Sequence, residues 1–141
     1  KCSKESIKLI QKDIPIDSTC VRVGSLSCHS QSVTMELKER LPIEEITSAI
    51  QKAHPWVSVI PNNSEDTKTH LNPIAVAHTL NINVGRIRYL SRSTPTINLF
   101  TVGDQLLWGA TEPLRRMAHH IRRFLSNQEE GASVCHDKCL K

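Results

Sequence analysis

The chain has 141 residues, an apolar fraction of 38%, five cysteines and a formal net charge of +4 at pH 7. This length fits one domain with a core of its own, and no stretch reaches the roughly 18 apolar residues of a membrane span. The five cysteines are odd in number and irregularly placed, which argues against a disulfide framework and indicates a reducing, cytoplasmic setting. No signal peptide is visible. Because the chain opens on Lys1 and not on Met, we expect its true N-terminus to lie upstream.

The first half of the chain predicts two strands and a helix. Residues 19–26 are predicted to form a strand that is broken at Gly24-Ser25. Over residues 32–37 apolar and polar side chains alternate, which predicts a half-buried strand. Pro42 then opens a helix whose apolar side chains recur at helical spacing.

The second half predicts short elements separated by polar stretches. Residues 56–60 are predicted to form a short apolar strand. Residues 62–70 are polar and are predicted to form a loop. A short helix starts at Asn72-Pro73 and continues through Leu80. Residues 84–90 and 97–102 are both typical of strands.

A last helix is predicted over about residues 104–125. Asp104 follows Gly103 and is a suitable N-cap, whereas Pro113 should kink or split this helix. One stripe of the helix is apolar: Leu107, Ala110, Leu114, Met117, Ile121 and Leu125. The composition becomes polar after Ser126, so the predicted domain covers residues 1–126 and residues 127–141 form a flexible tail.

The elements together predict an α+β fold. Strands and helices are interleaved, but the helices are too few for a regular alternation of parallel strands and crossover helices. We therefore expect a mixed, mostly antiparallel sheet that is covered by helices on one face.

Two residues near the first strand could carry chemistry. His29 lies just past a bend among polar neighbours, and an imidazole can move protons near neutral pH, although a surface histidine is the commoner reading. Cys28 should point to the opposite face of the strand, which argues for a small buried side chain and against a Cys-His pair. Arg22 could hold a carboxylate through two hydrogen bonds if its face looks into a cleft, and does nothing special if it faces water.

Three further patterns are weaker. The segment from Cys135 to Cys139 offers two thiols and one imidazole, but an unstructured end is the better interpretation of so polar a tail. The last helix carries Arg115, Arg116, Arg122 and Arg123, yet it lacks the aromatic anchors expected of a membrane or nucleic-acid surface. The five glycines are isolated, so no dinucleotide-binding loop is present.

The run from Phe100 to Met117, FTVGDQLLWGATEPLRRM, is the most specific pattern in the chain. Upstream of it lie CVRVGSLSCHSQ from Cys20, WVSVIPN from Trp56 and VGRIR from Val84. These motifs, in this order, resemble the C-terminal part of a bacterial-type aspartate-semialdehyde dehydrogenase. The resemblance covers nearly all of the chain from Lys1 to Met117, and it implies a C-terminal domain like that of glyceraldehyde-3-phosphate dehydrogenase-type enzymes.

The resemblance implies an activity in lysine, threonine and methionine biosynthesis. The family reduces β-aspartyl phosphate to aspartate semialdehyde with NADPH and releases phosphate, using a cysteine thiolate. By resemblance His29 is the general acid/base, Arg22 holds the substrate carboxylate, Lys1 contacts the substrate or phosphate, and Gln105 lies near the nicotinamide end of NADP(H).

The family's thiolate and nucleotide-binding half would lie upstream of Lys1. The chain alone is therefore expected to be inactive, because no covalent intermediate can form on it. The alternative is a non-catalytic dimerisation or interaction domain, since the equivalent family domain forms a homodimer. A module that binds nucleic acid or membrane has only the basic helix in its favour, so neither partner is expected.

Overall fold

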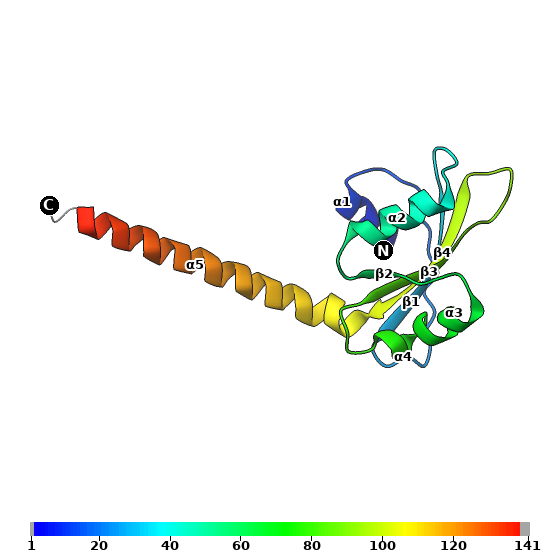
Figure 1. Ribbon diagram of the computed structural model, residues 1–141. Helices are drawn as coiled ribbons and strands as arrows, with labels where there is room; N and C mark the ends of the chain where they lie inside the picture. Colours follow the sequence, from blue (N-terminus) through cyan, green and yellow to red (C-terminus); the bar gives the residue numbers. More distant parts are fainter. Residues whose placement is uncertain (1, 139–141) are drawn as a thin grey trace.

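The computed structural model describes residues 2–138, with side chains described for residues 4–126. Over that range the chain alternates between helices and strands (Figure 1). The elements are α1 (Cys2–Ile10), β1 (Cys28–Glu36), α2 (Ile43–Ala53), β2 (Val57–Val59), α3 (Ser64–His70), α4 (Pro73–Val76), β3 (Ile82–Tyr89), β4 (Thr96–Asp104), the π-helix η1 (Leu107–Thr111) and α5 (Glu112–Lys138).

The four strands form one sheet in the order β1-β4-β3-β2. β4 pairs antiparallel with both β1 and β3, while β2 pairs parallel with β3. The expected α+β fold with a mixed, mostly antiparallel sheet is confirmed. The register places Val33 opposite Leu99 and His29 opposite Gly103, so these four residues share one face of the sheet.

Each face of the sheet has its own apolar cluster. On the face of Val33 and Leu99, Ile46 of α2 packs with side chains of β3 and β4, because α2 lies over β2 and β3. On the opposite face, Leu71 and Val76 pack with Cys28 and Val102. The helices are therefore distributed over both faces, with α2 on one side and the short α3 and α4 near one end of the other, whereas the sequence predicts helices on one face.

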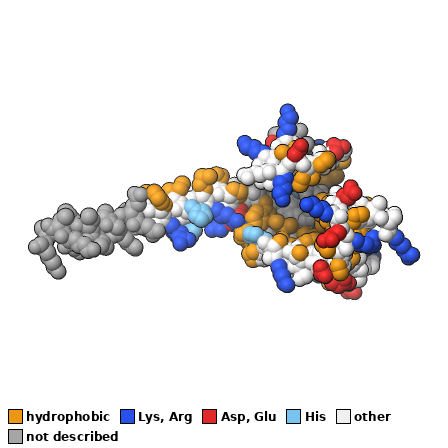
Figure 2. Space-filling model, turned by 90° about the horizontal axis from the view of Figure 1, so that it is seen from above, with side chains coloured by type: hydrophobic (Ala, Val, Ile, Leu, Met, Phe, Trp, Pro, Cys, Tyr) orange, Lys and Arg blue, Asp and Glu red, His pale blue; other side chains and the backbone are white. Residues whose placement is uncertain are grey.

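The last helix projects away from the sheet. α5 packs against η1 and then extends into solvent, as Figures 1 and 2 show. Apolar side chains along its described part are more than half exposed: Leu114, Met117, Ile121, Phe124 and Leu125. The apolar stripe predicted from the sequence is therefore present, and it faces solvent.

Two predictions about local structure are wrong. Residues 19–26 form no strand but lie in the irregular segment between α1 and β1, where Val21 and Val23 are 74% and 70% exposed. Alternating β-branched residues do not form a strand without a partner strand to pair with. The predicted loop over residues 62–70 contains α3, which Asn63 caps by accepting a hydrogen bond from the N–H of Asp66.

Pro113 is predicted to kink or split the last helix; α5 runs from Glu112 through Pro113, and a π turn lies directly before it. The Glu112 N–H donates to the carbonyl of Leu107, which gives the wider π turn directly before Pro113. The helical backbone then continues to Lys138, past the predicted end near residue 125. Mobility of residues 127–141 stays a prediction, and the side chains of Cys135 and Cys139 lie outside the described residues.

Candidate functional site

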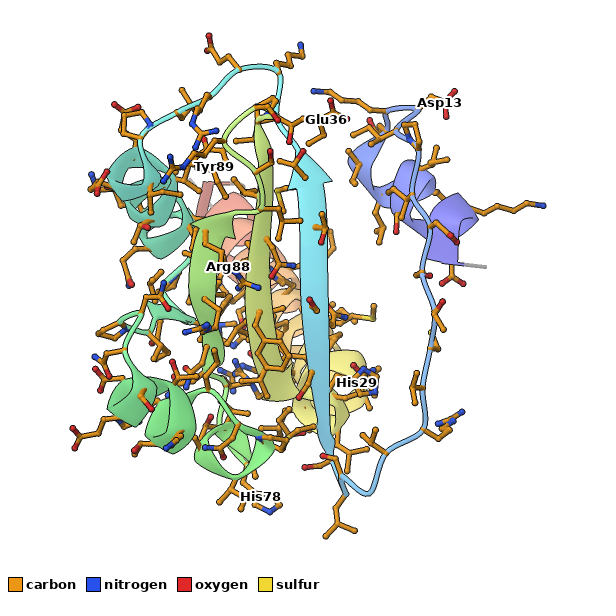
Figure 3. The ribbon with its side chains drawn as sticks, turned by 90° about the vertical axis from the view of Figure 1, so that its right-hand side faces the viewer. Asp13, His29, Glu36, His78, Arg88 and Tyr89 are labelled. Atoms are coloured by element: carbon orange, nitrogen blue, oxygen red, sulfur yellow. The ribbon has the colours of Figure 1, made fainter. Side chains whose placement is uncertain are left out.

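A small hollow lies where β1 and β4 meet the start of the last helix. Its volume is about 150 Å³. The residues around it are His29, Gln31, Ile82, Thr101, Val102, Gly103, Asp104, Gln105 and Trp108. The fold thus brings together two predicted site residues, His29 and Gln105, that are far apart in the sequence. Figure 3 shows His29 at the edge strand β1, on the side of the first turns of the last helix.

His29 and Cys28 point to opposite faces of β1, as predicted. Cys28 is buried, and its Sγ lies 3.3 Å from the carbonyl oxygen of Pro73 and 3.6 Å from Oγ of Ser27. The imidazole of His29 is exposed and forms no hydrogen bond with the described residues. A ligand in the hollow can therefore reach the imidazole. The thiol of Cys28 lies on the other face of the sheet, in contact with Pro73 and Ser27.

Asp104 joins three segments around the hollow. Its carboxylate is 1% exposed and accepts hydrogen bonds from Ser27 Oγ at 3.2 Å and the His78 N–H at 2.8 Å. The same carboxylate caps the final helix by accepting from the N–H groups of Leu106 and Leu107 at 2.9 and 3.2 Å. The predicted N-cap is confirmed, and the same carboxylate ties the end of β4 to Ser27, the residue before β1.

The pKa of Asp104 follows from this environment. Burial raises the pKa of the carboxyl, but the hydrogen bonds from His78, Leu107, Ser27 and Leu106 outweigh it, so the pKa lies below its usual value. Asp104 is therefore ionised at neutral pH, which lets both oxygens accept hydrogen bonds.

Gln105 is held by its backbone and free at its side chain. Its N–H donates to the carbonyl of Ser27 at 2.9 Å, two residues before His29. The carboxamide is exposed and makes no hydrogen bond with the described residues. It therefore offers a free donor and a free acceptor to a molecule in the hollow.

An aromatic and cationic cluster anchors the last helix beside the hollow. The guanidinium of Arg116 lies 3.9 Å from the ring centroid of Trp56, and the His54 ring stacks on the same ring at 3.8 Å. Two groups this close cannot share one face, so Trp56 lies between them. Trp108 meets Trp56 edge-on at 4.9 Å.

Glu112 completes this cluster. It is 4% exposed and accepts two hydrogen bonds from Arg115, at 2.7 and 2.8 Å, and one from Arg116 at 2.8 Å. These bonds, first from Arg115 and then from Arg116, hold the pKa of Glu112 at about 2. These bonds lie within the first turns of α5, so they stabilise the helix itself, while Arg116 also contacts the Trp56 ring.

Arg22 and Lys1 are not brought to the hollow by the described structure. Arg22 is exposed in the irregular segment before β1 and has no hydrogen-bond partner among the described residues. Lys1 lies outside the described residues. Their assignment to the substrate stays a prediction.

Sequence reasoning missed Gln31, Thr101 and Trp108, which also line the hollow. Gln31 lies two residues after His29 on the same face of β1, and Thr101 is its partner on β4. Alternation along the strand was a usable signal for Gln31. The place of Thr101 depends on the register, which the sequence does not show.

Two kinds of feature, a membrane-spanning helix and a metal-binding group, are absent from the described part of the chain. Its helices include none that is long and apolar enough to cross a membrane. Its histidine, cysteine and acidic side chains form no group of three or more that could hold a metal ion.

Comparison with known proteins identifies the domain. Residues 1–108 match the family model described as semialdehyde dehydrogenase, dimerisation domain. The chain belongs to the semialdehyde dehydrogenase family. The predicted relationship to the C-terminal part of aspartate-semialdehyde dehydrogenase is also confirmed by similar solved structures.

One similar structure is an aspartate semialdehyde dehydrogenase from Francisella tularensis, which is 48% identical with a TM-score of 0.80. The alignment covers 86% of this chain and 34% of that one, so the chain spans about a third of the relative. An aspartate semialdehyde dehydrogenase II from Vibrio cholerae, in a complex with ASA, is 22% identical with a TM-score of 0.66. The alignment covers 86% of this chain and 35% of the Vibrio cholerae chain, and the likeness supports the fold.

Proposed function

We propose that this chain provides the acid/base half of an aspartate-semialdehyde dehydrogenase. The observation that carries the proposal is the hollow that His29 and Gln105 both line, in a domain of this family. The reaction would reduce β-aspartyl phosphate with NADPH to aspartate semialdehyde and phosphate in the cytoplasm, in lysine, threonine and methionine biosynthesis. The similarity to the Francisella tularensis enzyme supports this choice of substrate.

His29 would be the general acid/base of this reaction. Its exposed imidazole lies beside the hollow, unpaired with other described side chains, so it can accept a proton from a thiol or hydroxyl and return it. The family's thiol is expected from outside the described side chains, because Cys28 is buried on the other face and the exposed Cys20 is not among the residues that line the hollow. We therefore expect no turnover from this chain by itself.

The residues present fit one end of NADP(H). The cofactor supplies hydride when it is bound, and the free carboxamide of Gln105 can donate to and accept from the amide of a nicotinamide ring. The glycines of this chain are isolated, so it offers no Gly-rich loop for the cofactor's phosphates. Arg22 and Lys1 would bind the substrate's carboxylate and phosphate groups.

A chimera tests this function directly. Residues 1–126 of this chain replace the matching part of the Francisella tularensis enzyme, and NADPH consumption is followed with β-aspartyl phosphate. We expect turnover that falls by a factor of about 10² to 10⁴ in His29→Ala, since general acid/base groups contribute about that much. His119→Ala, on the exposed face of α5, is the matched control and should keep the activity of the parent chimera. A folded chimera that binds NADPH but does not consume it would contradict the proposal.

The second candidate is a non-catalytic homodimerisation or interaction domain. The match to a dimerisation domain favours it, as does the exposed apolar stripe of α5. Light scattering of the 141-residue chain tests this candidate, and a strictly monomeric folded chain at high concentration would exclude self-association.

A further inference from the structure

Gly109 lies in η1, one helical turn after Gln105, and the Gln105 side chain lies over it. A Cβ added to Gly109 would overlap Nε2 of Gln105 and come within 2.9 Å of its Cδ. The three atoms nearest to that added atom all belong to the side chain of Gln105. Glycine at this position therefore leaves the space that the carboxamide fills.

The backbone does not require glycine at position 109. The described glycines all avoid positive φ, so conformational freedom is not the reason for Gly109. Glycine also weakens a helix interior relative to alanine. A residue that is unfavourable for the helix and not required by its backbone is best explained by the side chain that it accommodates.

The other end of Gln105 is fixed as well. Its N–H is bonded to Ser27, and the carboxylate of Asp104 holds the first N–H groups of the helix. With the backbone fixed, the direction of the carboxamide depends on the surface beneath it. That surface is the π turn with Gly109, and π turns occur often at functional sites.

We propose that Gly109 is a positioning residue that holds the carboxamide of Gln105 toward the hollow shared with His29. This inference rests on the proposed function for its kinetic consequence, since Gln105 would contact the cofactor. Any side chain at position 109 would push the carboxamide away while leaving the helix intact.

Kinetics of the chimera described above test this role. Gly109→Ala should raise the KM for NADPH by about 3- to 10-fold, the value of one hydrogen bond, and change kcat less. It should also keep or raise the melting temperature, because alanine favours the helix. Ala110→Gly, the reverse change at the next residue, is the matched control and should leave this KM unchanged. If glycine at position 109 were needed for the fold itself, Gly109→Ala would instead lower the melting temperature.

A double variant shows whether Gly109 acts through Gln105. Gln105→Ala should raise the same KM, and adding Gly109→Ala to it should cause no further increase. Additive effects, or an unchanged KM in Gly109→Ala, would overturn the proposal.

A structural measurement separates this inference from the proposed function. In the 141-residue chain, the side-chain amide NMR signals of Gln105, assigned through Gln105→Ala, should shift in Gly109→Ala and stay in place in Ala110→Gly. If the parent chimera is inactive, the proposed function fails and these signals decide the position of Gln105. Unchanged signals would refute the role of Gly109.

Discussion

Replacing Arg116 with methionine tests how α5 is anchored. Methionine keeps an apolar stem but removes the guanidinium, which lies 3.9 Å from the Trp56 ring centroid and 5.2 Å from that of Trp108. It also removes one of the three hydrogen bonds to Glu112, while the two from Arg115 remain. The change therefore isolates the contribution of Arg116.

The magnitude follows from these contacts. The Arg116 side chain is 35% exposed, so its interaction with the rings contributes about 0.5–1 kcal/mol and its hydrogen bond a similar amount. We expect Arg116→Met to lower the free energy of unfolding by about 1–2 kcal/mol. For a chain of this size that corresponds to a decrease in melting temperature of roughly 3–7 °C.

Thermal unfolding followed by tryptophan fluorescence and circular dichroism measures this effect. The chain has two tryptophans, Trp56 and Trp108, and both lie in the cluster, so fluorescence reports on it selectively. Arg115→Met is the matched control, because the Arg115 side chain is 64% exposed and lacks the ring contacts of Arg116, so this variant should lower stability less. Equal destabilisation by both variants, or no coupling between Arg116→Met and Trp56→Leu in a double-mutant cycle, would refute the reasoning.

Three further predictions concern the rest of the domain. The pKa of Glu112 is lowered from 4.5 to about 2, so its stabilising contribution is present above pH 4.5 and is lost as the pH falls toward 2; the melting temperature should fall over this window, and less so in Glu112→Gln. His78 has φ of 61°, which disfavours residues with a side chain, so His78→Gly should stabilise the fold by about 1 kcal/mol in chemical denaturation, and any loss of stability would contradict this. Val76 is fully buried between α4 and the sheet, so Val76→Ala should destabilise by about 2–3 kcal/mol, whereas Ile74→Ala in the same helix, at a side chain 90% exposed, should change stability little.

The predictions that succeeded depended on signals carried by neighbouring residues. Helical spacing after Pro42 gave α2, because its apolar face packs on the sheet. Alternation over residues 32–37 gave β1, although most of this strand is exposed and Val33 is only partly buried against the core. Asp104 was identified as a cap from its place after a strand and before an apolar stripe. In each case the local pattern and the tertiary contacts favour the same structure.

The failures show where local patterns are insufficient. α3 has no buried side chain, so the search for an apolar stripe missed it, although the capping pair Asn63 and Asp66 was visible in the sequence. Residues 19–26 had the alternation of a strand but no partner strand. Trp108 and Thr101 reach the hollow through the π turn and the register of β1 with β4, which depend on the whole fold.

The two halves of the proposed site differ in how firmly they are held. His29 lies on a paired strand and Gln105 follows a capped junction, so the sheet and Asp104 fix both backbones. Arg22 lies in an irregular segment, exposed, without a partner among the described residues. If Arg22 holds the substrate carboxylate, its exposed side chain must be immobilised on binding, and this costs conformational entropy. Substrate binding should then be more sensitive than proton transfer to changes in residues 12–27. Shortening this segment in the chimera should raise the KM for β-aspartyl phosphate while preserving the dependence of kcat on His29, and a loss of kcat alone would argue against Arg22 as the clamp.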